Sequence, residues 1–448
     1  MRVNFTEFST AVDMVTKALS GNASGILVTV GDETAVVCGD NRTACYKAVD
    51  IRFNDEAEKA VGNIIIDYAM LDDALKKMSS SGSIKVDDLV IDTTNIDNKI
   101  VTLEASKYVN VQNGDDIFKQ ITTTMKEDIR AFKASNESDV DSKYRTVTRF
   151  DYNTRIFGSD TSDTWNRKDL ITVIKKLSGG EDGKLAYLMR QHKVGMTVNK
   201  SSVFVFNCKD GLENYSVSMT GKMGKNICDV LSKVSEDTVQ VVNSDGAYCS
   251  MYTEDHKFGL WFMMAQYRNT DGEKWAMYKN SDPETLRQYD YISVLLNREV
   301  MLDMIKSYKY KNKLDSSQIK FNFVDDDARR SLKRVITDED NNTTEEFVDA
   351  TGNVAIQIGN KKNEMVKVFA PARRSEGSAE CIDLVMTFPV WEEILNACES
   401  TYVRFGMHKV DDRIFYLKFD DLSETEVGED GKPVAIAEVY TTATSKSE

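Results

Sequence analysis

The sequence predicts an α+β fold of three tandem domains, and three observations carry this prediction. One sequence pattern recurs six times in 448 residues: a short amphipathic helix followed by strands that alternate apolar and polar residues. Turn signals separate the strands, as in antiparallel sheets. Hydrophobic residues make up 41% of the chain, enough for several cores. Two repeats then form one domain, with two helices packed on antiparallel sheet. The expected helices span residues 5–20, 68–80, 165–178, 222–235, 297–309 and 388–399.

The composition argues against several classes of protein. No run of about 18 apolar residues occurs, so no transmembrane helix is expected, and the opening MRVNFTEFSTAVDMV does not resemble a secretory signal. The seven cysteines are scattered and form no CxxC, which favours a reducing cytoplasm over a disulfide or zinc framework. The three histidines lie far apart. We therefore expect a cytoplasmic protein that binds no cofactor, no metal and no membrane.

The first domain is expected at residues 1–140. Its first helix has apolar residues at helical spacing from Phe5 to Leu19, and glycines at 21 and 25 end it. The strands GILVTVGD, TAVVCGDN and CYKAVDIRF follow. The second helix, YAMLDDALKKMSS, buries one apolar stripe and precedes the strands SIKVDDLVIDTT and KIVTLEASKYV. That stripe consists of Leu71, Ala74, Leu75 and Met78.

A charged connector is expected at residues 112–142, between the first and second domains. We expect a helix in its first part, DDIFKQITTTMKEDIRAFKA, because the apolar residues recur at near-helical spacing. Its second part, SNESDVDSK, is polar and reads as a loop.

The second and third domains are expected at residues 141–288 and 289–448. Their clearest strands are SSVFVFN, NYSVSM, TVQVVNS and FGLWFM, then IKFNF, VAIQIG, YVRFGMHK, RIFYLKFD and VAIAEVYTT. A charged, loop-like insertion is expected at residues 325–350. Pro389 fits the first turn of the last helix, where its missing N–H costs little.

Positive charge is segregated although the net charge is −15. Three helices carry basic residues opposite their apolar stripes, which on the 297–309 helix are expected to be Val300, Met301, Met304 and Ile305. Such faces suit a protein that contacts the phosphate backbone of DNA without reading bases. Lysine is also common on solvated helix faces, so each helix alone has this simpler explanation. The candidate DNA-binding residues are Lys168, Lys175, Lys176, Lys222, Lys225, Lys233, Arg298, Lys306 and Lys309.

The chain resembles the DNA polymerase sliding clamps of bacteria and their phages. The resemblance lies in the repeated architecture and in short stretches of local sequence. It covers most of the chain apart from residues 112–142 and 325–350. The segments that carry it are NIIIDYAMLDDALKKMSSSGSIKVDD, ICDVLSKVSEDTVQVVNSDGAYCSMYTEDHKFGLWF and LVMTFPVWEEILNACESTYVRFGMHKVDDRIFYLKF.

The resemblance implies a processivity factor that encircles duplex DNA and does no chemistry. A clamp ring places twelve helices around its pore, so a chain with six helices would close as a head-to-tail homodimer. The edge strands of the first and third domains would pair across the joint. Divergence from the bacterial pattern suggests a phage member, which would act in the host cytoplasm.

Clamps also bind short linear peptides of DNA polymerases and clamp loaders in a groove between the second and third domains. The turn CKDGLENY is similar to the turn that forms this groove, but it lacks the His-Arg that usually follows Asp-Gly in bacterial clamps. Ordinary turn packing is the alternative role for its residues. The groove residues that the resemblance nominates are Gly211, Leu212, Tyr215, Val439 and Tyr440.

Two other classes of function compete with this reading. The clusters Asp325–Asp327 and Asp338–Asp340 could bind a divalent metal, but each lies in a polar loop mixed with basic residues, and no catalytic motif is present. A non-enzymatic structural or assembly protein of repeated α+β units would show the same periodicity. That protein would not need cationic helix faces, and retention on circular but not linear DNA separates the two.

Overall fold

The computed structural model describes two compact units, and each is considered by itself. Unit 1 comprises Met1–Lys175 and Lys222–Ala265, and unit 2 comprises Lys176–Gly221 and Gln266–Glu448. The described residues are 1–19, 23–40, 43–53, 62–114, 116–135, 140–144, 151–158, 162–178, 186–189, 203–207, 216–244, 247–264, 286–312, 318–322, 331–337, 343–349, 354–359, 366–370, 373–376, 384–411 and 414–445.

Unit 1 is built on one antiparallel sheet of twelve strands, in the order β1-β6-β7-β8-β5-β2-β3-β4-β15-β14-β13-β9. A further pairing joins β1 to β4, so the first eight strands form a closed hydrogen-bonded cycle. The strands are β1 (Arg2–Asn4), β2 (Gly25–Val30), β3 (Thr34–Asp40), β4 (Thr43–Arg52), β5 (Ile64–Asp67), β6 (Asp88–Asp92), β7 (Ile100–Asn113), β8 (Asp116–Lys133), β9 (Asp163–Asn166), β13 (Thr238–Ser244), β14 (Tyr248–Tyr252) and β15 (Phe258–Met263).

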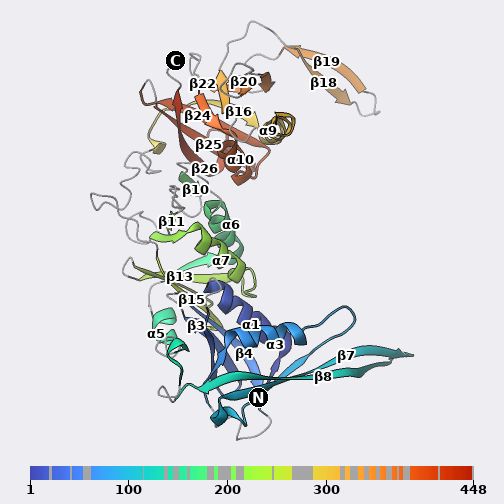
Figure 1. The fold of residues 1–448 in the computed structure, drawn as a ribbon. Coiled ribbons are helices and arrows are strands. Elements are labelled where there is room, and N and C mark those ends of the chain that lie inside the picture. Colours follow the sequence, from blue (N-terminus) through green and yellow to red (C-terminus); the bar gives the residue numbers. More distant parts are fainter. Residues whose placement is uncertain are drawn as a thin grey trace. The chain divides into compact units, whose positions relative to one another are not determined.

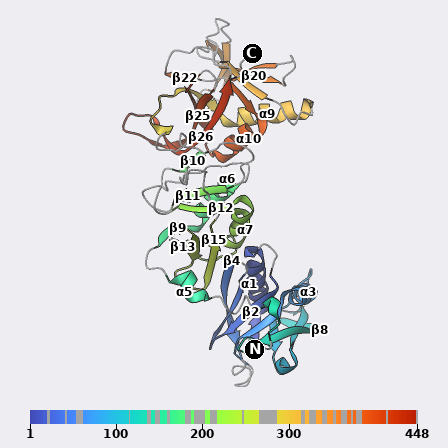
Figure 2. The same cartoon turned by 60° about the vertical axis from the view of Figure 1, so that its left-hand side comes forward.

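Helices lie on both sides of this sheet (Figures 1 and 2). On one side are α1 (Phe5–Ala18), α3 (Tyr68–Met78), α6 (Arg167–Ser178) up to Lys175, and α7 (Gly221–Leu231). On the other side a short helix, α5 (Tyr152–Phe157), packs on β14 and β15. Gly259 permits this approach, because a Cβ there would lie 2.5 Å from Cγ2 of Ile156. Helix α5 was not predicted from the sequence.

Unit 2 contains a ten-stranded antiparallel sheet with the order β21-β20-β17-β23-β26-β25-β24-β16-β22, and β10 pairs with β26 off this path. Helices α9 (Arg298–Asn312) and α10 (Phe388–Ala397) pack side by side (Figure 1). The strands are β10 (Ala186–Met189), β16 (Ile292–Asn297), β17 (Gln318–Asn322), β20 (Val354–Gly359), β21 (Val366–Ala370), β22 (Arg373–Glu376), β23 (Leu384–Thr387), β24 (Tyr402–Lys409), β25 (Ile414–Val427) and β26 (Pro433–Ser445). Two hairpins stand apart from this sheet: β11 (Val203–Asn207) with β12 (Ser216–Thr220), and β18 (Ser331–Thr337) with β19 (Thr343–Asp349).

The same strand-to-helix junction occurs three times. In each copy a strand ends at an asparagine whose side chain caps the following helix: Asn4 for α1, Asn166 for α6 and Asn297 for α9. The first helical residue then donates its backbone N–H to a carbonyl just before the strand that follows the second helix. These bonds join Phe5 to Asp87 (2.8 Å), Arg167 to Asp237 (2.8 Å) and Arg298 to Thr401 (2.9 Å).

The structure confirms the predicted α+β class and all six predicted helices, but two local predictions are wrong. Residues 116–133 form strand β8, not a helix, because they pair along their length with β7 around a turn at Gly114 (φ +64°). The three consecutive threonines at 122–124 also favour a strand. The predicted loop at 325–350 contains the hairpin of β18 and β19. None of the described helices is long and apolar enough to cross a membrane.

Candidate nucleic-acid interface

Among the described helices, α6 and α7 expose the most lysines that were predicted to contact DNA. Their apolar faces are buried, including Leu170 and Ile174 of α6 and Ile227 and Leu231 of α7. The Cys228 thiol donates to the Ile171 carbonyl at 3.6 Å, which joins the two helices. Burial of these faces leaves the opposite faces to solvent. The lysines exposed there are Lys168, Lys175, Lys222 and Lys225.

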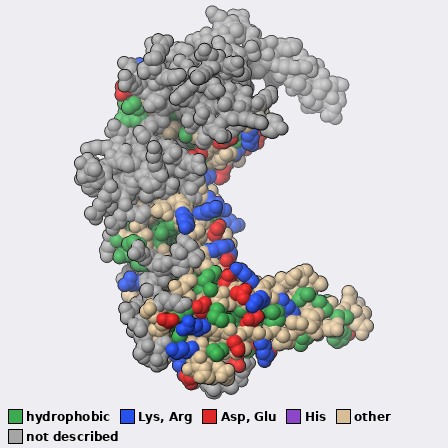
Figure 3. Space-filling model, viewed as in Figure 1, with side chains coloured by type: hydrophobic (Ala, Val, Ile, Leu, Met, Phe, Trp, Pro, Cys, Tyr) green, Lys and Arg blue, Asp and Glu red, His purple; other side chains and the backbone are tan. Residues whose placement is uncertain are grey.

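Three of these lysines have no ion-pair partner within the described ranges: Lys168, Lys222 and Lys225. An ammonium group without a fixed carboxylate can bind a phosphate without first breaking a protein contact. Lysine and arginine side chains gather along the side of unit 1 that carries α7 and α1, with acidic side chains interspersed (Figure 3).

Lys233 lies just beyond α7 and differs from these lysines. It forms an ion pair with Asp13 of α1, and Asp13 also lies 3.4 Å from Lys17 of the same helix. Burial lowers the pKa of the Lys233 ammonium from its usual value. Lys233 therefore joins α7 to α1 as well as adding positive charge.

Helix α3 is electrically neutral on its outer face. Lys76 pairs with Asp72 at 2.5 Å, and Lys77 pairs with Asp73 at 2.9 Å and with Glu127 of β8 at 3.3 Å. The first two pairs are four residues apart on the helix, where such contacts are geometrically easy. This neutrality agrees with the sequence, which supplied no DNA-contact candidate from this helix.

Two of the residues predicted to contact DNA bind mainly to other groups of the protein. Lys176 has a side chain only 14% exposed and pairs with Glu399 at 3.0 Å, so it does not lie on an open face. Arg298 is half-buried, and its Nε donates to the Leu395 carbonyl near the end of α10 at 2.7 Å. Arg167 does the same in the preceding copy, where it donates to the carbonyls of Glu236 and Leu231.

Helix α9 presents Lys306 as an exposed residue of the predicted set, whereas the side chain of Lys309 lies outside the described residues. Its apolar stripe differs from the prediction. Val300 is 40% exposed, while Met301, Leu302 and Ile305 are buried. The predicted stripe is therefore correct at Met301 and Ile305 but wrong at Val300, and it omits Leu302.

The predicted peptide groove is only partly described. Gly211, Leu212 and Tyr215 lie outside the described residues. Val439 and Tyr440 are buried in β26, where Val439 pairs with Tyr187 of β10. Burial also raises the pKa of the Tyr440 phenol. Neither side chain presents an open surface in this structure.

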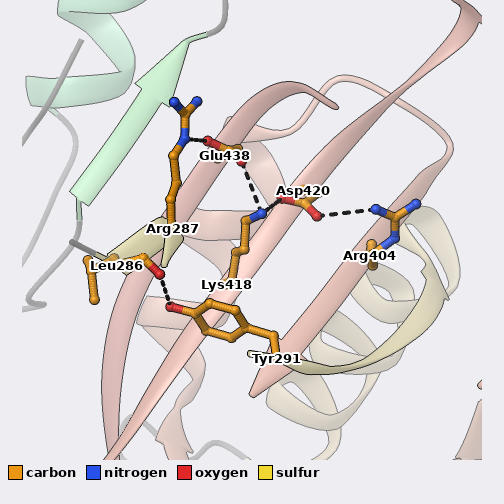
Figure 4. Close-up of polar contacts among 7 residues, drawn as sticks. All are labelled: Leu286, Arg287, Tyr291, Arg404, Lys418, Asp420 and Glu438. Carbon is orange, nitrogen blue, oxygen red and sulfur yellow. Dashed lines mark hydrogen bonds and ion pairs between the residues drawn. The ribbon is translucent and has the colours of Figure 1, made fainter. Parts of the chain in front are cut away.

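A chain of charged groups runs from Arg287 to Arg404 (Figure 4), and the ammonium of its Lys418 lies 5.9 Å from the ring centroid of Tyr440. Burial raises the pKa of Asp420, despite its two cationic neighbours. Burial lowers the pKa of Lys418, but Asp420 and Glu438 raise it by more, so the ammonium stays charged. The contacts are Arg287–Glu438 (2.6 Å), Lys418–Glu438 (3.0 Å), Lys418–Asp420 (3.1 Å) and Arg404–Asp420 (3.6 Å).

No cluster of three or more His, Cys, Asp or Glu that could hold a metal occurs among the described residues, and the two acidic clusters at 325–327 and 338–340 lie outside the description. The five described cysteines are buried. Burial raises the pKa of Cys45, Cys228 and Cys398 to about 12, so these thiols are not ionised at neutral pH.

The fold is similar over its whole length to bacterial DNA polymerase sliding clamps. The DNA polymerase sliding clamp of Bacillus subtilis matches with a TM-score of 0.59 at 10% identity, covering 100% of this chain and 99% of that one. The DNA polymerase III subunit beta of Pseudomonas aeruginosa gives 0.59 at 11% identity and 99% of each chain. The corresponding Thermotoga maritima protein gives 0.55 at 12%, with 100% and 99% covered. No family model matches the sequence, and no curated protein matches it.

At these identities the comparison establishes the fold: the chain has the sliding-clamp fold. The sequence analysis missed the capping asparagines and the contacts that Arg167 and Arg298 make with backbone carbonyls. A signal for the asparagines was available, because one stands directly before helices α1, α6 and α9, in RVNF, TWNR and LLNR.

Proposed function

We propose that this protein is a DNA polymerase processivity factor, a sliding clamp that encircles duplex DNA without sequence specificity. The observation that carries the proposal is the match of the whole chain to bacterial sliding clamps. In this role the protein performs no reaction. It holds a polymerase near its template and so raises the effective concentration of polymerase at the primer end.

DNA contact is assigned first to the exposed lysines Lys168, Lys175, Lys222, Lys225 and Lys306. Lys233 and Lys309 extend this set. Lys176 and Arg298 are assigned mainly a positioning role, because they are bound to Glu399 and to the Leu395 carbonyl. Contacts of lysine with phosphate are salt-sensitive and independent of sequence, which permits sliding.

Ring closure is proposed through a head-to-tail homodimer. In the described structure the outer edge of β15 is paired with β4, and the outer edge of β26 is paired with β10. In both cases the covering strand comes from an earlier part of the chain. The corresponding edge of β8 has no described partner along residues 116–130. A second copy can supply that partner from its C-terminal unit.

Polymerase and clamp loader are proposed to bind through short linear peptides, at the groove predicted around Gly211, Leu212, Tyr215, Val439 and Tyr440. Since Val439 and Tyr440 are buried, peptide binding there requires a rearrangement of neighbouring side chains or of β10. Cytoplasmic localisation and phage origin remain predictions.

Retention on DNA of different topology tests the proposal. After loading, the protein should remain on nicked circular duplex and leave the same DNA after linearisation, because a ring slides off free ends. Its mass in solution should be about 100 kDa, twice the 50.5 kDa of one chain. Equal retention on both forms, or none on either, would contradict the proposal and favour an assembly protein.

The assignment of lysines is tested separately. Lys222→Glu with Lys225→Glu should reduce clamp-dependent synthesis and retention on circles, most strongly at higher salt. The control is Lys85→Glu with Lys257→Glu, which makes the same charge change at exposed lysines outside the helices. An equal loss in both double variants would assign the effect to net charge and not to α7.

A further inference from the structure

The outer part of the β7–β8 hairpin, residues 107–124, forms an arm that projects from unit 1 (Figure 1). Its two strands remain paired to the turn, where Asn113 faces Asp116. Most of its side chains are exposed. A two-stranded ribbon with so little burial is marginally stable in water, so its shape needs support from other groups.

The base of the arm supplies that support. Lys85 and Tyr108 exchange two backbone hydrogen bonds of 2.8 and 3.0 Å. Asp87 accepts a hydrogen bond from the Tyr108 hydroxyl at 2.5 Å and pairs with Lys119 of the opposite strand. Lys107 donates to the Lys77 carbonyl at the end of α3 at 2.6 Å. These contacts fix the direction in which the arm leaves the unit.

The tip of the arm is apolar. Ile117 is 68% exposed, Ile121 63%, Phe118 54% and Val111 41%, and Val111 faces Phe118 across the two strands. Figure 3 shows hydrophobic side chains along the arm. By strand alternation Ile117 and Ile121 lie on one face of the ribbon, and Phe118 and Val111 lie on the other. Exposed apolar residues on a braced element are typical of an interaction surface.

The pairing pattern of the repeats indicates which molecule covers this surface. β5 pairs with β8 as β23 pairs with β26, so Lys133 corresponds to Ser445. By this correspondence, residues 125–128 of β8 occupy the place of residues 437–440 of β26, which β10 covers. The arm tip lies farther along the same strand. Ile117 is eight residues from Met125, about 26 Å at 3.3 Å per residue.

We propose that the arm tip is a clasp between subunits, which packs Ile117, Phe118 and Ile121 against the C-terminal unit of a second copy. The inference rests on the proposed ring and extends it, because the clasp reaches beyond the strand-edge joint. An apolar tip whose one lysine, Lys119, is already paired with Asp87 fits an apolar protein surface. It does not fit DNA, which requires cationic contacts.

The first test compares dimer dissociation constants by mass photometry over a dilution series. The combined variant Ile117→Ser, Phe118→Ser and Ile121→Ser should raise the constant at least about tenfold and shorten retention on circular DNA. The control is Met263→Ser, which changes an exposed (41%) apolar residue of β15, outside both the arm and the C-terminal unit. Control behaviour should equal that of the unaltered protein. An unchanged constant in the triple variant would overturn the clasp.

The second test detects the contact by crosslinking and does not depend on weakening the dimer. A photo-crosslinking phenylalanine analogue replaces Phe118, and the protein is mixed with an isotope-labelled copy. Crosslinks should join labelled to unlabelled chains and map to residues 286–445. Crosslinks confined to one chain, or to an added polymerase, would overturn the proposal. If the unaltered protein itself formed no ring, the proposed function would fail independently of the arm variants.

Discussion

The hairpins β7–β8 and β25–β26 occupy the same place in the repeat, yet they have opposite environments. Each follows a helix and one strand: α3 and β6 in the first case, α10 and β24 in the second. Most of β25 is buried up to Leu422, whereas β8 is exposed over its first nine residues. The burial of a hairpin therefore depends on which elements pack against it, and not on its place in the repeat.

The cores at the two hairpins differ accordingly. Phe419 of β25 is fully buried against Trp391 of α10 and Phe405 of β24, with ring centroids 5.3 and 4.7 Å away. Phe118 of β8 is 54% exposed. The charged groups follow the same contrast, since Asp420 is buried among cations and Asp87 is an exposed brace.

The largest effect is expected from matched truncations of the two phenylalanines. Phe419→Ala should lower the free energy of unfolding by about 3–5 kcal/mol, because it opens a cavity beside Trp391. Phe118→Ala should change the unfolding free energy of the dissociated chain by less than about 0.5 kcal/mol, because its ring is mainly exposed within one chain. Denaturant unfolding of both variants measures the difference, and similar losses would contradict the contrast.

The next largest effect is expected from removal of the buried Asp420 carboxylate. Asp420→Ala should cost about 2–3 kcal/mol, since Arg404 loses its carboxylate while Lys418 keeps Glu438. Asp87→Ala should cost about 1 kcal/mol or less, because its ion pair is exposed. Thermal unfolding at neutral pH checks the order, which would be reversed if the arm brace were the stronger network.

The capping asparagines should contribute smaller and similar amounts. Asn4→Ala and Asn297→Ala should each cost about 1 kcal/mol, because each removes the acceptor for a backbone N–H in the first turn of its helix. Chemical denaturation of both variants measures this. The matched control is Asn98→Ala, an exposed asparagine outside α1 and α9, which should change little. Strongly unequal costs would show that the junctions are not equivalent.

The smallest effect is a dependence on pH with opposite signs at the two sites. Hydrogen bonds from Lys119 and then Tyr108 lower the pKa of Asp87 below its ordinary 3.8. Its stabilising contribution is therefore present above pH 3.8 and lost as pH falls through the lowered pKa. The unfolding free energy of the unaltered protein relative to Asp87→Asn should fall, by less than about 1 kcal/mol, from about pH 5 to about pH 2.

Asp420 should behave in the opposite way. Burial raises its pKa, so the folded state binds the proton more readily than the unfolded state does. The unfolding free energy relative to Asp420→Asn should therefore rise as pH falls through the raised pKa toward 3.8. The same pH series of denaturant titrations measures both pairs of proteins. Parallel trends for the two pairs would contradict the assigned environments.

Helices and most strands could be predicted because their signals are local. The apolar stripe of α3 was identified in full, since Leu71, Ala74, Leu75 and Met78 are all buried. The helix predicted at 115–134 failed because its apolar spacing is compatible with a strand once β7 provides a ladder. The stripe predicted for α9 was wrong at Val300, which is exposed, whereas Leu302 is buried.

The candidate DNA-binding residues also divide into those whose exposure followed the prediction and those whose exposure did not. Lys168, Lys222 and Lys225 were expected on open faces and are exposed. Lys176 was expected on the same face as Lys168, but Glu399, more than 200 residues away in sequence, holds it in a partly buried ion pair. Helical period predicts the direction of a side chain and does not predict which distant carboxylate meets it.

By itself, the sequence determined the α+β class, the six helices and the excess of lysine on α6, α7 and α9, because these follow from the period of neighbouring residues. Tertiary structure alone decided that β7 and β8 form a braced arm and that Lys176 is enclosed. These features depend on contacts between residues far apart in the chain, and such contacts leave no periodic trace in the sequence.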